Sequence, residues 1–369
     1  MLKKLSNWIV ICVSLFIYIN AYATTLPYPY IAISDTLSSE TMGNLVEYNG
    51  NLFLIGVDAA KKSVILQFND SLTNPKWSAV SDGLPKEYKS INMLSIVKQK
   101  LFIAGINAKN PEELQSYIAE YKLSQDKKYI WEPLSTKGLP NWSMLSKMID
   151  FNGNLIANVM SGERNPLYLF DSSKQTWSPM PFIAEQVTDI AVFRDKLYMS
   201  NQKGIYVYKD NQWQSINNGL PNYKDKDGAV ITGYYNNLVV FNDTLFVDGC
   251  LVSTVENNHS IQHGILYAYN GNDSAPQWTE MTSGLPINYV YTTVSLLKYD
   301  ETPTVIVKDI SLDNKGEVFS LGKDNIWHSN ENFPKNIMIT QLLASADHKK
   351  LYLQVMENNH YVIYVKVNT

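Results

Sequence analysis

Cysteine is nearly missing from this chain of 369 residues, which has only Cys12 and Cys250. Cys12 lies in an N-terminal apolar stretch that we expect to be removed, so the mature chain would keep one thiol. A single cysteine cannot form an internal disulfide, even in a compartment where disulfides form. Stability must therefore come from burial of apolar surface, for which a composition of 45% apolar and 12% aromatic residues is sufficient.

Arginine and net positive charge are also scarce. The chain has two arginines, Arg164 and Arg194, and 31 basic against 35 acidic residues. Removal of Lys3 and Lys4 with the N-terminal stretch leaves 29 basic residues and a net charge near −6. Binding of nucleic acid needs a concentrated basic surface, so nucleic acid is not expected as a partner.

The chain has little that resembles a membrane span. Trp8 to Ile19 are twelve mostly apolar residues, whereas a membrane-spanning helix needs about twenty. Two lysines precede this stretch and Ala21-Tyr22-Ala23 follows it, which is typical of a secretory signal peptide. We expect residues 1–23 to be a signal peptide cleaved after Ala23. Residues 24–369 would then form one domain of a secreted or periplasmic protein without a membrane span.

The sequence does have a repeated tryptophan. Six tryptophans are each followed by a proline within nine residues, four of them through the tripeptide Gly-Leu-Pro. Repeats of about fifty residues built from short strands predict a β-propeller. An indole on the outermost strand of each blade would fill the wedge between blades, and the glycine and proline would end that strand. The six units are Trp77 to Pro85, Trp131 to Pro140, Trp177 to Pro181, Trp213 to Pro221, Trp278 to Pro286 and Trp327 to Pro334.

Each unit repeats the same order of short strands and turns. In the first unit the expected strands are residues 45–48, 52–56, 63–68 and 76–80. Asn49-Gly50 lies between the first two and predicts a type I′ hairpin turn, in which both central residues need positive φ. Helical periodicity extends nowhere over more than about a turn, so an all-β fold is expected.

The two ends of the chain decide the number of blades. After Pro334 the sequence offers three strands, residues 337–345, 350–355 and 360–367. Tyr30 to Leu37 aligns without a gap with Trp77 to Leu84, so the N-terminus is expected to supply the missing outer strand. The expected fold is all-β: a seven-bladed β-propeller of four-stranded antiparallel blades, with the ring closed by the N-terminal strand that completes the last blade.

The repeats resemble two kinds of propeller family. Leu167 to Trp177 resembles the third and fourth strands of a kelch repeat, in which an aromatic residue and an Asp precede a Trp, and Gly204 to Trp213 is a shorter version. The Gly-Leu-Pro tripeptide resembles the links of BNR-like and two-component-sensor propellers. These resemblances imply a propeller over the whole mature chain.

The same resemblances offer no enzyme template. Sialidases of this architecture grip a carboxylate with three arginines, and this chain has two. Copper enzymes that resemble galactose oxidase need a cysteine cross-linked to a tyrosine, and Cys250 is the single thiol after the apolar stretch. No catalytic residue, cofactor or metal is therefore expected.

Aromatic residues that follow the inter-blade prolines are the main candidates for ligand binding. The loops that link blades share one face with the loops between second and third strands, around the mouth of the central channel. Aromatic side chains on that face would form a binding platform, unless they tuck under neighbouring loops. These residues are Tyr88, Trp142, Phe182, Tyr223 and Tyr289.

A second group of candidates lies in the longest insertion, about residues 252–263 of the fifth blade. His259 and His263 have the i, i+4 spacing that presents two metal ligands on one face of a helix. We expect a solvated loop here instead, and so no metal. Glu256, His259 and His263 are retained as candidate ligand-binding residues.

Three functions are compatible with these observations. The leading hypothesis is a monomeric, non-catalytic propeller that binds a protein partner through the aromatic face. The second is a carbohydrate-binding, lectin-like propeller, which predicts similar pockets repeated between blades. The third is a hydrolase or lyase of unfamiliar type, which would need carboxylates and a histidine at the channel mouth. The expected partner is accordingly a protein or a glycan.

Overall fold

The computed structural model describes most of the chain between Tyr30 and Val367. The expected signal peptide and its cleavage site lie outside the described residues. The described ranges are 30–33, 45–58, 62–69, 76–85, 88–108, 114–141, 143–161, 166–181, 186–224, 230–232, 234–255, 259–286, 292–299, 302–309, 315–331, 333, 337–345, 350–357 and 360–367.

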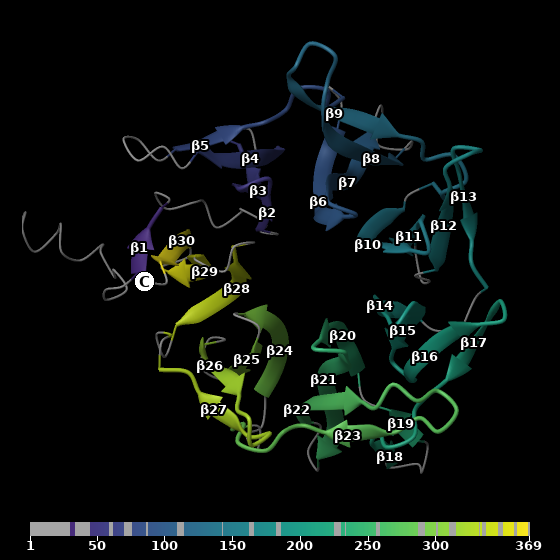
Figure 1. Ribbon diagram of the computed structural model, residues 1–369, viewed down its shortest axis with the longest axis vertical. Helices are drawn as coiled ribbons and strands as arrows, with labels where there is room; N and C mark the ends of the chain where they lie inside the picture. Colours follow the sequence, from purple (N-terminus) through teal and green to yellow (C-terminus); the bar gives the residue numbers. More distant parts are fainter. Residues whose placement is uncertain are drawn as a thin grey trace, which may run out of the picture.

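Seven four-stranded antiparallel sheets stand in a ring, which confirms the predicted propeller (Figure 1). In blades 1 to 6 four strands pair in the order of the sequence, with the first strand of each blade nearest the centre. The described ranges contain no helix, and thus none long and apolar enough to cross a membrane. Blade 1 is β2 (Val46–Tyr48), β3 (Asn51–Val57), β4 (Ser63–Asn69) and β5 (Lys76–Ala79); blade 2 is β6 (Tyr88–Val97), β7 (Lys100–Ala108), β8 (Leu114–Leu123) and β9 (Tyr129–Leu134); blade 3 is β10 (Met144–Phe151), β11 (Asn154–Met160), β12 (Leu167–Asp171) and β13 (Thr176–Pro179). Blade 4 is β14 (Val187–Phe193), β15 (Lys196–Asn201), β16 (Gly204–Lys209) and β17 (Gln212–Ser215); blade 5 is β20 (Tyr234–Phe241), β21 (Thr244–Val255), β22 (His259–Tyr269) and β23 (Trp278–Glu280); blade 6 is β24 (Thr292–Tyr299), β25 (Thr302–Asp309), β26 (Lys315–Leu321) and β27 (Trp327–Ser329).

Blade 7 combines the two ends of the described chain. Its strands are β28 (Met338–Ala344), β29 (Lys350–Glu357), β30 (His360–Val367) and β1 (Tyr30–Ala32). The short β1 pairs antiparallel with β30, with Tyr30 opposite Lys366. This is the pairing that the alignment of the N-terminus predicts. That it holds the ring shut stays a prediction, which a deletion variant can test.

The hairpins between first and second strands have the expected turn geometry. Asn49 and Gly50 have φ of 49° and 74°, and Asn152 has φ of 49°. Arg194 adopts the same region at 48°. Two successive residues with positive φ match the right-handed twist of the flanking strands, which is why Asn-Gly predicts these turns. A further hairpin, β18 (Asn222–Lys224) with β19 (Val230–Thr232), lies between blades 4 and 5 and is not anticipated by the repeat pattern.

Five of the six repeated tryptophans form a hydrogen bond between their own blade and the preceding one. Trp131 is 0% exposed, and its indole N–H donates to the carbonyl of Val80 at 2.9 Å. Its backbone N–H donates to the carbonyl of Asp82 at 2.8 Å. The indoles of four other tryptophans make the equivalent bond across an interface. These bonds are Trp177 to Ser135, Trp213 to Pro181, Trp278 to Ile216 and Trp327 to Met281, at 2.6 to 2.9 Å.

The glycine of the first Gly-Leu-Pro tripeptide, Gly83, is required for two reasons, its φ angle and the space around it. Gly83 has φ of 89°, which favours glycine, and it lies in a turn closed by the N–H of Leu84 donating to Ser81. A Cβ on Gly83 would also stand 2.2 Å from the carbonyl oxygen of Trp131. The glycine therefore permits the backbone contact between blades as well as the turn.

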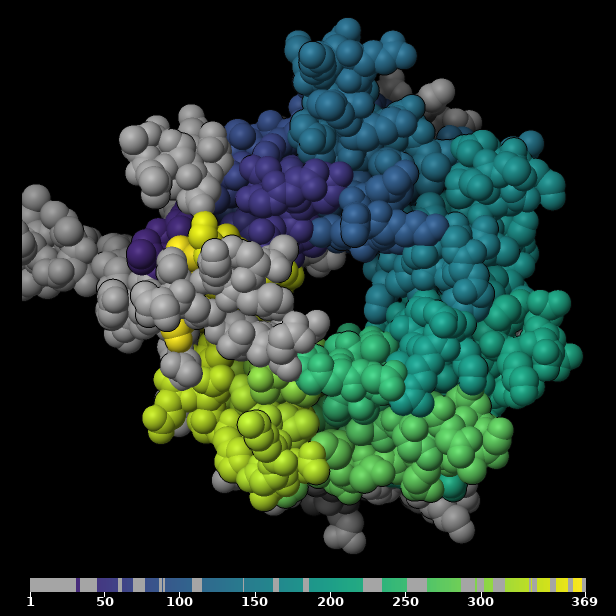
Figure 2. All heavy atoms as spheres, in the orientation of Figure 1, coloured from purple at the N-terminus to yellow at the C-terminus, as the bar shows by residue number. Residues whose placement is uncertain are grey.

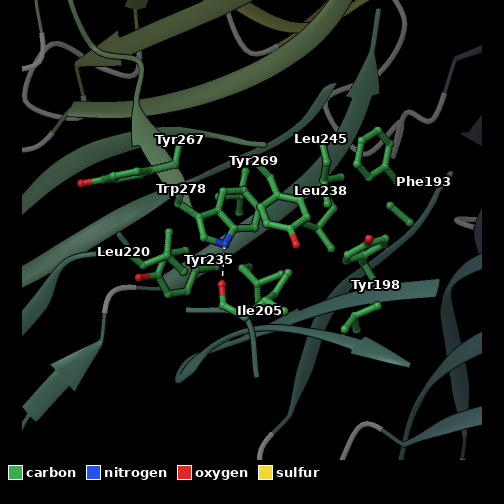
Figure 3. Packing of buried hydrophobic residues seen from close by; sticks show 14 of the residues in the cluster. Phe193, Tyr198, Ile205, Leu220, Tyr235, Leu238, Leu245, Tyr267, Tyr269 and Trp278 are labelled. Atoms are coloured by element: carbon green, nitrogen blue, oxygen red, sulfur yellow. Dashed lines mark hydrogen bonds between the residues drawn. The ribbon is translucent and has the colours of Figure 1, made fainter. Parts of the chain in front are cut away.

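The apolar core is distributed over the blade interfaces. The cluster in Figure 3 takes Phe193 and Ile205 from blade 4 and Leu245 and Trp278 from blade 5, and the dashed line marks the indole bond of Trp278. Further clusters join other neighbouring blades. The space-filling view shows an opening at the centre of the ring (Figure 2). The inner strands around that opening position the candidate site.

Candidate functional site

Most of the candidate residues from the sequence cannot be compared with side-chain positions. Tyr223 lies in β18, and His259 and His263 lie in β22, where the structure describes the backbone. The aromatic platform stays a prediction for the residues that lie outside the described ranges. Those are Trp142, Phe182 and Tyr289, and Glu256 of the fifth-blade insertion also lies outside the described ranges.

Tyr88 lies at the start of β6 and is 7% exposed. Its ring packs with Ile91, and the Nζ atom of Lys62 lies 3.9 Å from the ring centroid. Burial, and next the charge of Asp58, raises the pKa of Tyr88. The ring is therefore held beneath its neighbours, which is the alternative to an exposed platform.

The expected loop around His259 and His263 is wrong, because these residues belong to a long hairpin. β21 and β22 pair continuously, with His259 opposite Val255 and His263 opposite Leu251. Four residues of extended strand separate two Cα atoms by about 13 Å. The i, i+4 spacing that suits a helix therefore does not bring these two positions to one metal ion.

Most inner strands carry a β-bulge with polar residues. Register shifts occur in β6, β10, β14, β20 and β28. A bulge turns one extra residue out of the ladder and re-aims its side chain. Polar residues stand at or opposite these bulges, on the strands that border the central opening (Figure 1).

Neutral side chains at these positions bond to the backbone of the next blade. The amide of Asn92 in blade 2 donates to the carbonyl of Leu145 in blade 3. Gln341 in blade 7 makes two such bonds with Leu45 ahead of blade 1: its amide donates to the carbonyl, and its oxygen accepts from the N–H, both at 2.7 Å. Similarly, the amide of Asn158 donates to the carbonyl of Val187 at 3.2 Å. We call these contacts the inner belt.

A charged pair joins blades 3 and 4 in the inner belt. The Nζ atom of Lys147 lies 2.7 and 2.9 Å from the two carboxylate oxygens of Asp189. Asp189 also accepts from the backbone N–H groups of Ile190 and Leu238, each at 2.8 Å. The side chain of Lys147 is 36% exposed and that of Asp189 is 9% exposed. Lys147 is thus the more exposed member of the pair.

A second carboxylate lies in the next blade, blade 5. Asp248 of β21 is 0% exposed and accepts from the backbone and side-chain N–H groups of Asn237 and from the N–H of Leu296 in blade 6. Burial raises the pKa of Asp248 to about 6, against the lowering effect of these bonds, and the charge of Asp189 adds to the increase. Asn237 and Leu238 are consecutive, so one peptide segment connects the two carboxylates.

Cys250, two residues further along β21, is the free cysteine of the described chain and is half-buried. Burial raises the pKa of its thiol, and the charge of Asp248 adds to this. A raised pKa keeps the thiol protonated and poorly nucleophilic. Among the described residues, no group of three or more His, Cys, Asp and Glu side chains is arranged to hold a metal ion.

Sequence reasoning missed Lys147, Asp189 and Asp248. A usable signal was present for the two carboxylates, since each stands beside apolar residues in a strand: Asp189 lies in Val187–Phe193 and Asp248 follows Phe246-Val247. A charged residue inside a buried strand is costly unless it is paired, and it often marks a functional position.

Solved structures similar to this chain match it over nearly its whole length. One is polysaccharide lyase Uly1, at 11% identity and a TM-score of 0.54, covering 94% of this chain and 93% of that chain. A PL25 ulvan lyase bound to -[GlcA(1-4)Rha3S]- matches at 10% identity and a TM-score of 0.52, over 91% and 94% of the two chains. Dihydro-heme d1 dehydrogenase NirN matches at 9% identity and a TM-score of 0.51, over 93% and 68%. No protein-family model and no curated protein sequence matches the chain.

These similarities bear on two expectations. At such low identity they establish the propeller fold, while the kelch and BNR resemblance extends to architecture only. The three structures named above are enzymes by their descriptions, and two of them are polysaccharide lyases. The expectation of a non-catalytic propeller for a protein partner is therefore wrong, since it rested on the lack of a familiar enzyme template and this architecture supports other chemistry.

Proposed function

We propose that this chain is an exported enzyme that acts on a polysaccharide, as a hydrolase or a lyase, with Lys147 and Asp189 at its centre. One observation supports this most: a charged pair in the inner belt at blades 3 and 4, on strands that border the central opening. The structural likeness to polysaccharide lyases supports the same proposal.

The inner belt does not need charge for its structural task. Asn92 and Gln341 connect neighbouring blades with neutral amides. Asp189 and Asp248 do so with carboxylates, which must be taken out of water at a cost of several kcal/mol per ion before pairing offsets it. A carboxylate has a higher desolvation cost than the neutral amide that makes the same kind of contact elsewhere in the ring. Its presence therefore favours a chemical role for these positions.

Within the pair, Asp189 acts as a support. Its two oxygens already accept from two backbone N–H groups and from Lys147. This arrangement gives both carboxylate oxygens hydrogen-bond partners and fixes the position of the ammonium group. Lys147 is therefore a preorganised cation whose side chain remains partly exposed.

A fixed cation suits an acidic sugar. The ammonium of Lys147 would bind the carboxylate or sulfate of one residue of the polysaccharide. In a lyase, the same charge would stabilise the negative charge that develops on a uronate when the proton next to its carboxylate is removed. In a hydrolase, it would hold the acidic sugar beside a general acid and a base.

Product analysis tests this proposal. The purified mature protein would be incubated with acidic polysaccharides (polygalacturonate, alginate, hyaluronan) and neutral ones (xylan, arabinan). Elimination leaves a carbon–carbon double bond that absorbs ultraviolet light together with a new reducing end, whereas hydrolysis leaves the reducing end alone. We expect cleavage of at least one acidic polysaccharide. If none is cleaved, the enzymatic proposal fails; if only neutral ones are, the role of Lys147 fails.

A further inference from the structure

Two pockets occupy equivalent positions at two blade interfaces. One lies between blades 2 and 3 and has a volume of about 240 Å³. The other lies between blades 5 and 6 and has a volume of about 440 Å³. Both are lined by the turn between first and second strands and by the turn between third and fourth strands, so both open on the same end of the blades. The two interfaces are on opposite sides of the ring (Figure 1).

The floors of the two pockets are built from corresponding residues. Phe102 and Phe246 lie on the second strand of the earlier blade. Phe170 and Leu321 pair with the repeated tryptophan of the later blade. The third floor position, three residues after the tryptophan of the earlier blade, is Leu134 in the first pocket and Met281 in the second.

A pocket at this position is not an automatic result of blade packing. Between blades 4 and 5 the corresponding space is filled by Arg194, whose guanidinium pairs with Asp243 at 2.6 Å. It lies so close over Gly271 that a Cβ there would be 2.1 Å from one of its nitrogens. Between blades 1 and 2, Tyr48 and Tyr121 pack edge to face, with ring centroids 6.5 Å apart. The open interfaces thus depend on the residues that this sequence places there.

We infer that these two pockets bind sugar residues of one polysaccharide chain, apart from the centre at Lys147. An apolar floor suits the C–H face of a sugar, and amide side chains on the rim, such as Gln175 and Asn242, suit its hydroxyl groups. Two equivalent sites on one face suit a polymer with a repeating unit. Once one pocket has bound the polymer, the second pocket binds another unit of the same chain, which raises the overall affinity. The choice of a glycan as occupant rests on the proposed function.

The chain itself suggests a variant that closes one pocket. Asn242 has φ of 42° and stands at the turn position that Arg194 occupies with φ of 48°. Asn242→Arg therefore copies a residue that this turn geometry accepts and places a guanidinium over the pocket between blades 5 and 6. Asn49→Arg is the matched control, since Asn49 holds the same turn position in blade 1 with φ of 49° and lines neither pocket.

The experiment is electrophoresis through native gels that contain polygalacturonate, alginate, hyaluronan or xylan. We expect at least one of these polysaccharides to retard the wild type and Asn49→Arg equally. The same polysaccharide should bind Asn242→Arg about tenfold or more weakly, because the avidity of two pockets is lost. Equal retardation of all three proteins, or no retardation of the wild type in any gel, would overturn the inference. Cleavage is measured separately, so a retarded protein that cleaves nothing refutes the enzymatic proposal and leaves the pockets standing.

Discussion

Replacement of Asp248 by asparagine should change how the stability of this protein depends on pH. The folded-state pKa of Asp248 is about 6, whereas an unfolded chain gives about 3.9. Because the native state binds this proton more tightly, the stabilisation from the group is fully present below about pH 4 and is lost as the pH rises through about 6. Two pKa units correspond to about 3 kcal/mol, of which roughly half falls between pH 5 and pH 7.5.

The assay is urea unfolding followed by tryptophan fluorescence, for the wild type and Asp248→Asn, at about pH 5 and about pH 7.5. The absolute stability of the variant will differ, since an asparagine cannot accept all the bonds from Asn237 and Leu296. The informative quantity is the change with pH. The wild type should gain about 1 to 2 kcal/mol relative to the variant on acidification. Parallel pH dependence of the two proteins would refute a buried carboxyl that protonates near pH 6.

Two further predictions concern the scaffold. Trp131→Ala should cost about 3 to 5 kcal/mol of unfolding free energy because the indole is 0% exposed; the half-buried Trp213 should cost roughly half as much. Equal losses in urea unfolding would show that burial of the indole does not set its contribution. Deletion of residues 24–40 removes β1 and leaves β30 with an unpaired edge, so the melting temperature should fall and the protein should associate in size-exclusion chromatography. A truncated monomer that melts with the intact protein would show that β1 does not hold the ring.

The repeat architecture could be predicted because its signals are local in the sequence. Asn49-Gly50 identifies a hairpin through the conformational demand of two residues, and strand boundaries in blade 1 fall within about one residue of those observed. The tryptophan position follows from the shape of a wedge between blades. The structure adds that Gly83 also makes room for the carbonyl of Trp131, some fifty residues away. Such a contact depends on how neighbouring blades pack, and the sequence of one repeat does not contain it.

The candidate site could not be predicted for the same kind of reason. Lys147 and Asp189 are 42 residues apart and meet only because bulges shift the register of β10 and β14. A bulge reverses the side on which the following residues point, so a regular alternation of strand residues gives no warning of it. The histidines differ in kind: the sequence around His259 and His263 predicts a loop, whereas these two residues lie in paired strands.

We propose that Lys147, held by Asp189, is the functional centre. The most direct test is kcat/KM of the wild type and two lysine variants on the polysaccharide that the wild type cleaves. Lys147→Gln keeps a donor for Asp189 but removes the charge. Lys122→Ala removes an exposed lysine that pairs with Glu132 on the outer strands of blade 2. We predict a loss of about a hundredfold or more for Lys147→Gln and wild-type activity for Lys122→Ala, with both proteins folded. Wild-type kcat/KM in Lys147→Gln would contradict the claim.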